Sequence, residues 1–195
     1  MNDSVSDIKK LKNIIYLVRC IAMKKSLASI DNNPHLNFWR LISGVWLDTS
    51  VVEWCKIFGS KNEDTHWTKS ITTENKRKDF QVNLLKLLKI NDSDWKNYIV
   101  KMKIYRDKYT SHTDLDNEAN KKLTNYPTLD YALESTFFYY EQLWLEYKDL
   151  PSISDSELKN LSSLRNYYDE FINHTIHVAA TAYKATRNIS ELLKT

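Results

Sequence analysis

Residues 5–30 read VSDIKKLKNIIYLVRCIAMKKSLASI, and this stretch decides the fold class. Its apolar side chains recur at steps of three and four residues, the spacing that places them on one face of an α-helix. They are Ile8, Leu11, Ile14, Ile15, Val18, Ile21, Ala22, Leu27 and Ala28. The pattern predicts a long amphipathic helix whose apolar face packs against other helices.

The rest of the chain repeats helical patterns that are separated by polar stretches. The expected helices cover 34–58, 74–90, 92–112, 128–147 and 157–190. Residues 60–72 and 113–126 are polar and are expected to be connections. Because no repeat and no linker interrupts the pattern, residues 1–195 are expected to form a single domain. Its fold class is all-α, an up-and-down helical bundle of about five or six helices.

Two of the expected helices carry distinctive faces. The helix that starts near Pro34 and stops at Gly59 is expected to bury one stripe. The stripe consists of Phe38, Leu41, Ile42, Val45, Trp46, Thr49 and Val52. The helix over 128–147 has an aromatic face, made of Tyr131, Phe137, Phe138, Tyr139, Tyr140, Trp144 and Tyr147. Aromatic residues at helical spacing predict a buried core or a dimer interface, and a base-stacking surface is the alternative.

Composition excludes several classes of protein. With only two glycines, the chain has no Gly-rich phosphate loop and too few turn residues for a β-rich fold. Cys20 and Cys55 are isolated, so neither a zinc site nor a disulfide framework is expected; no cofactor and no metal is predicted. The longest early apolar run, 14–23, is about half of the roughly twenty residues that span a membrane. The sequence predicts a soluble, cytoplasmic protein with no membrane contact.

Charge is unevenly distributed along the chain. Residues 69–108 hold eleven Lys or Arg and five acidic residues, a net charge of +6, whereas residues 113–157 carry −7. A basic surface is what an RNA-contacting face needs. Solvated helix faces explain the same pattern without any ligand, and both interpretations stay open.

The basic segment ends in the string RDKYTSH, residues 106–112. Arg106 is permanently cationic and presents a planar donor fork that matches phosphate. Histidine is the side chain whose unperturbed pKa lies nearest neutral pH, so His112 could both accept and donate a proton. On an ideal α-helix these two residues lie about 240° apart. They therefore share a site only if the helix ends or unwinds near Ser111, or if they meet across a dimer interface.

RDKYTSH, with Asp114 close behind, resembles the Arg/His motif that defines the HEPN superfamily. The stretch WLDTSVVEWCKIFGS (46–60) and the following His66-Trp67 resemble the AbiU-like branch, which is named for abortive phage infection. The resemblance covers roughly residues 5–150, with the motif region at 94–116. It implies a HEPN-like helical bundle that forms a homodimer in which both motifs face one composite cleft.

For function, the resemblance implies a metal-independent endoribonuclease of a toxin–antitoxin or phage-defence system. Arg106 would hold and polarise the scissile phosphate, His112 would act as general acid and base, and Asp107 would orient either of them. The expected product is a 2′,3′-cyclic phosphate. The residues expected to bind RNA are Lys103, Lys108, Tyr109 and Ser111. The implied partners are RNA, a second copy of the chain and a protein antitoxin, whereas DNA is not expected.

A non-catalytic HEPN-like protein that binds RNA or nucleotides, or serves as a scaffold, is the alternative function. In that case Arg106 and His112 would stabilise a helix end or a subunit contact. His174 and His177 lie three residues apart on one helix face and could share a metal. Because no third ligand is evident, a polar or partner-facing pair is the favoured interpretation. His66-Trp67 is expected to anchor its loop, since an indole usually packs while its N–H finds a partner.

Overall fold

The computed structural model describes residues 2–31, 36–111, 126–150 and 163–192, and the side chains of 2–7, 109–111 and 187–192 lie outside the description as well. The prediction of an all-α bundle is confirmed, and the described residues contain no strand. The α-helices are α1 (Asn2–Ile30), α2 (Asn37–Trp54), α3 (Trp67–Ser70), α4 (Glu74–Leu88), α5 (Asp92–Tyr105), α7 (Asp130–Tyr147) and α9 (Leu164–Leu192). Two π-helices, η1 (Cys55–Gly59) and η2 (Arg106–Ser111), continue α2 and α5.

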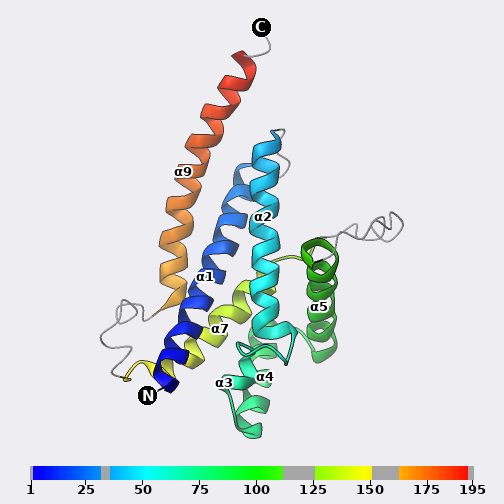
Figure 1. Cartoon of the computed structure of the whole chain (residues 1–195), viewed down its shortest axis with the longest axis vertical. Coiled ribbons are helices and arrows are strands. Elements are labelled where there is room, and N and C mark those ends of the chain that lie inside the picture. The colour runs from blue at the N-terminus through cyan, green and yellow to red at the C-terminus, as the bar shows by residue number, and fades with distance from the viewer. Residues whose placement is uncertain (1, 32–35, 112–125, 151–162, 193–195) are drawn as a thin grey trace.

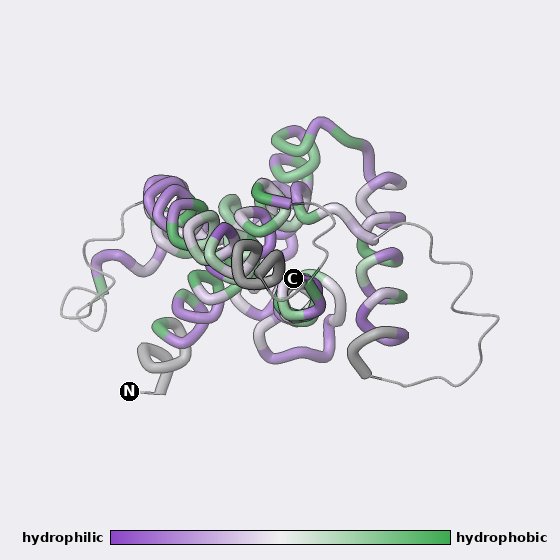
Figure 2. Tube along the Cα trace, turned by 90° about the horizontal axis from the view of Figure 1, so that it is seen from above, coloured by the Kyte–Doolittle hydropathy of each residue, from purple (hydrophilic) through white to green (hydrophobic). Residues whose placement is uncertain are grey.

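α1 is the centre of the bundle. α9 runs along one side of it, α2 along another, and α7 crosses it obliquely (Figure 1). The predicted apolar face of residues 5–30 is confirmed, since Leu11, Ile14, Val18 and Ile21 are fully buried. Seen from above, the helices carry both hydrophobic and hydrophilic residues, as amphipathic helices do (Figure 2). No helix in the described part of the chain combines the length and apolarity needed to cross a membrane.

An aromatic cluster joins α2, η1, α5 and α7. The Trp54 ring stacks on Phe58 at a centroid distance of 5.3 Å and meets Trp95 and Tyr98 edge-on. The buried Trp54 indole donates its N–H to Ser135 Oγ on α7 at 3.0 Å. Most of the aromatic face of α7 is buried in the same core, at Phe137, Tyr139, Tyr140 and Trp144. The aromatic helix is thus a core element, as the buried-core interpretation of the sequence expected.

The predicted buried stripe of α2 is wrong for part of its length. Phe38, Leu41 and Val45 are 57%, 68% and 48% exposed. The residues that α2 buries are Trp39, Leu47, Ser50, Val51 and Trp54. The reason is that α2 carries apolar residues on two nearly opposite faces, and only one of them packs against α1. Phe38, Leu41 and Val45 therefore form an exposed apolar stripe along α2.

The segment 60–72, expected to be a connection throughout, contains the short helix α3. The anchoring predicted for it is found: His66 is buried and caps α3 by accepting the Thr68 backbone N–H, and Trp67 stacks on Phe80 at 4.6 Å. α4 then ends at Leu88, two residues before the predicted end, because Lys89 adopts a left-handed conformation with φ of 55°.

Helix boundaries elsewhere agree with the sequence in outline. Asn91 caps α5 by accepting the Asp94 backbone N–H at 2.8 Å, one residue before the predicted start. Gly59 ends η1, where the sequence predicts the end of this helix, and it does so without a positive φ. α9 is described from Leu164 onward. The predicted proline signals at 34 and 151, the connection 113–125 and the start of the last helix at 157 lie outside the described residues.

Candidate functional site

The candidate site lies where α5 passes into η2 beside α2. α5 buries Trp95, Tyr98, Met102 and Tyr105, whose spacing keeps them on one helix face. At the end of this face the Tyr105 hydroxyl donates to Asp48 Oδ1 of α2 at 2.7 Å. The hydrogen bond and the buried face fix the position of the next residue, Arg106, against α2.

η2 changes the winding of the chain from Arg106 onward. A π-helix bonds residues five apart, so the backbone at Ser111 returns to the side on which Arg106 lies. In an α-helix these two positions would be about 140° apart. The winding between Arg106 and Ser111 thus departs from that of an α-helix, and a site shared by Arg106 and His112 stays a prediction. His112 itself lies outside the described residues.

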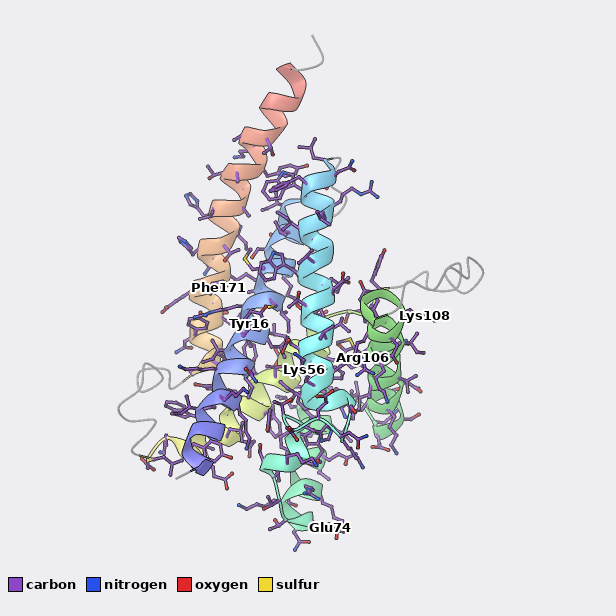
Figure 3. All side chains as sticks on the ribbon, in the orientation of Figure 1. Tyr16, Lys56, Glu74, Arg106, Lys108 and Phe171 are labelled. Atoms are coloured by element: carbon purple, nitrogen blue, oxygen red, sulfur yellow. The ribbon has the colours of Figure 1, made fainter. Side chains whose placement is uncertain are left out.

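Arg106 is held by its neighbour. Its guanidinium donates from Nε and Nη2 to Oδ1 of Asp107, at 2.8 Å and 2.7 Å. The Arg106 side chain is 23% exposed, whereas that of Asp107 is 54% exposed. The ion pair holds the guanidinium in one orientation and leaves the carboxylate at the surface. In Figure 3, Arg106 lies in the space between α2 and α5.

η1 packs against α5 next to the site. A Cβ on Gly59 would lie 3.1 Å from Cys55 Cβ, so glycine avoids a tight contact within η1. Lys103 Cγ of α5 would lie 3.6 Å from the same Cβ, an ordinary van der Waals distance. Burial raises the pKa of the Cys55 thiol to about 12, and the positive charges of Arg106 and Lys103 oppose this only in part. The thiol is therefore protonated and unsuited to act as a nucleophile. Cys20 is buried as well.

The structure brings together some of the predicted site residues. The positive charges of Lys103 and Arg106 both lower the pKa of the Cys55 thiol. Both side chains therefore belong to the face of the α5–η2 helix that packs on η1. Lys108 is half-buried and lies on the other side, away from α2 (Figure 3). The side chains of Tyr109 and Ser111, expected to bind RNA, lie outside the description.

A cleft of about 660 Å³ opens on the same side of α2, and the sequence analysis missed it. Its lining includes Lys24 and Lys25 of α1, Arg40 and Ser43 of α2, Tyr105 of α5, and Tyr126. These residues are far apart in the chain. No periodicity or short motif connects them, so only the packing of α1 against α2 reveals the cleft.

The remaining sequence candidates separate into buried and exposed groups. Burial, reinforced by Lys61 and Lys69, lowers the pKa of His66 to about 4, so its imidazole is neutral and serves as a helix cap. His174 and His177 are exposed on α9. Among the described residues no group of three or more His, Cys, Asp or Glu side chains could hold a metal ion.

Comparison with known proteins adds no relative to this picture: no family model, no curated protein and no solved structure matches the chain.

Proposed function

We propose that this protein is a metal-independent endoribonuclease of the HEPN type, which acts as a homodimer in a toxin–antitoxin or phage-defence system. The observation that carries the proposal is the placement of Arg106. It is a half-buried guanidinium held by Asp107, at the point where the helix widens into η2. π-Turns inside helices occur frequently at functional sites. The chain passes from this turn directly into His112.

The chemistry assigned to these residues is transesterification. The substrate's 2′-oxygen attacks the adjacent phosphorus, a P–O2′ bond forms and the P–O5′ bond breaks. The 2′-hydroxyl loses its proton and the leaving 5′-oxygen gains one, with His112 moving the proton. Arg106 neutralises the charge that develops on the phosphoryl oxygens. Asp107 keeps the guanidinium fork oriented, because an ion-paired arginine loses less freedom when it binds phosphate.

The exposed apolar stripe of α2 supports the homodimer. Phe38, Leu41 and Val45 project from consecutive turns of one helix face, next to the cleft. Contiguous apolar surface of this kind marks interaction sites in folded proteins. A second copy that covers this stripe would lie on the helix against which η2 packs.

The test is cleavage of a mixed RNA pool in the presence of EDTA. Wild type, His112→Ala and Arg106→Ala are compared, with His177→Ala as the control for removal of an exposed histidine from the same protein. We expect wild type and His177→Ala to cleave and to leave 2′,3′-cyclic phosphate ends, and the two site variants to lose cleavage by at least about a hundredfold.

The scaffold alternative makes the opposite prediction for the same proteins. The Arg106–Asp107 ion pair joins neighbouring residues at a helix junction, which is also what a purely stabilising arginine would do. On that interpretation wild type leaves RNA uncut, while Arg106→Ala and His112→Ala melt at a lower temperature or lose the dimer. Full cleavage by His112→Ala would overturn the nuclease proposal.

A further inference from the structure

The cleft between α1 and α2 has an excess of positive charge. Lys25 pairs with Asp130, and Asp48 accepts the Tyr105 hydroxyl, so the two acidic groups of the cleft already have partners. Lys24 Nζ bonds to the neutral Ser43 Oγ at 2.5 Å. Within the described part of the chain, neither Lys24 nor Arg40 forms an ion pair.

The surroundings of Lys24 disfavour its positive charge. It is half-buried, and burial lowers its pKa although the negative charge of Asp48 opposes the change. A partly desolvated ammonium without a paired carboxylate is stabilised by any anion that enters the cleft. Arg40 lines the same space from α2 and is exposed. The two cations and the Ser43 hydroxyl together offer the donors that a phosphate group needs.

The same cleft also contains an aromatic ring. Tyr126 lines the cleft and is 68% exposed. Its ring meets the buried Tyr105 ring edge-to-face, with centroids 6.0 Å apart and planes at 66°. Tyr105 thus supports Tyr126 while leaving ring surface free for a planar ligand. An exposed aromatic next to cations is the combination that binds nucleic-acid bases by stacking.

We propose that this cleft binds a nucleoside phosphate, with the phosphate on Lys24 and Arg40 and the base on Tyr126. Its volume of about 660 Å³ lies inside the range typical of small-molecule sites. A free nucleotide and one nucleotide unit of a single-stranded RNA present the same chemistry. The inference stands independently of cleavage at Arg106, because it concerns binding by residues that take no part in the proposed reaction.

The experiment is isothermal titration calorimetry on the full chain with two probes. One probe is ADP, and the other is a six-nucleotide RNA whose 2′-hydroxyls are methylated so that it cannot be cleaved. Binding of ADP identifies a free nucleotide as a ligand, and binding of the RNA alone identifies a unit of the strand. Failure of both probes to bind overturns the proposal.

Variants then locate the site. Arg40→Met and Tyr126→Ala should each weaken binding about tenfold or more, which is a loss of at least about 1.4 kcal/mol. Lys24→Met should do the same, and its melting temperature shows whether it folds. The matched controls are Lys86→Met on the exposed surface of α4 and Tyr16→Ala on α1, whose tyrosine is 46% exposed. Wild-type affinity in Arg40→Met and Tyr126→Ala, both exposed positions, would refute the assignment.

Discussion

Protonation of His66 should destabilise the fold in mildly acidic solution. The side chain is 3% exposed, and its Nδ1 accepts the Thr68 backbone N–H at 3.3 Å and lies 2.7 Å from Thr68 Oγ1. Burial, with Lys61 and Lys69 adding to it, lowers its pKa from 6.5 to about 4. The folded protein therefore keeps the imidazole neutral at pH values where the unfolded chain protonates it.

The sign and size follow from proton linkage. Between pH 6.5 and 4 the unfolded chain binds the proton and the folded chain does not, so the free energy of unfolding falls as pH falls. Each pH unit between the two pKa values corresponds to about 1.4 kcal/mol, which gives roughly 3 kcal/mol for the whole interval. Lys61 and Lys69 are exposed, and solvent screening of their contribution reduces the expected loss to about 2 kcal/mol.

The assay is urea unfolding of wild type and His66→Asn at several pH values from 4.5 to 7.5. Asparagine keeps an acceptor for the Thr68 N–H but does not titrate. The difference in unfolding free energy between the two proteins cancels the titration of all other groups. We expect this difference to be constant above pH 7 and to fall by about 2 kcal/mol toward pH 4.5. A difference that does not change with pH would refute the reasoning.

Three further substitutions test the packing around the site. Leu41→Glu should dissociate the proposed dimer in analytical ultracentrifugation, whereas Leu145→Glu, at an equally exposed position, should leave it intact. The same sedimentation of both variants would mean that the α2 stripe is not an interface. Ser135→Ala should lower the free energy of unfolding by about 1–3 kcal/mol, because it leaves the buried Trp54 N–H without its acceptor; an unchanged urea midpoint would contradict this. Tyr105→Phe removes the hydrogen bond that holds the start of η2 on α2, so it should lower the free energy of unfolding by only about 1 kcal/mol but reduce RNA cleavage severalfold. Cleavage at the wild-type rate would show that this hydrogen bond does not position Arg106.

The fold was most predictable where a helix has a single apolar face. α1 buries most of the residues that its spacing predicts, because its opposite face is largely polar and leaves no second choice. α2 has apolar residues on two nearly opposite faces, and periodicity alone does not decide which one packs on α1. The stripe with Phe38, Leu41 and Val45 was therefore assigned to the core although it lies at the surface.

The candidate site was predictable only in its local part. The resemblance implied that Asp107 orients Arg106 or His112, and the structure contains an ion pair between Arg106 and Asp107. The π-turns were not predictable, because a bond between residues five apart leaves no mark in a hydrophobic pattern of period 3.6. The cleft was also missed, since Lys24, Arg40 and Tyr126 come from three distant segments that meet only after folding.

The π-turn η2 has a consequence for how the gene tolerates mutation. A π-turn holds more residues per turn than an α-helix, so η2 contains extra backbone at the end of α5. Removing one residue between 106 and 111 takes up this extra backbone and allows α-helical winding with better hydrogen-bond geometry. Single-codon deletions in this window should therefore be tolerated by the fold better than deletions within α5, where each lost residue rotates the rest of the helix by about 100°.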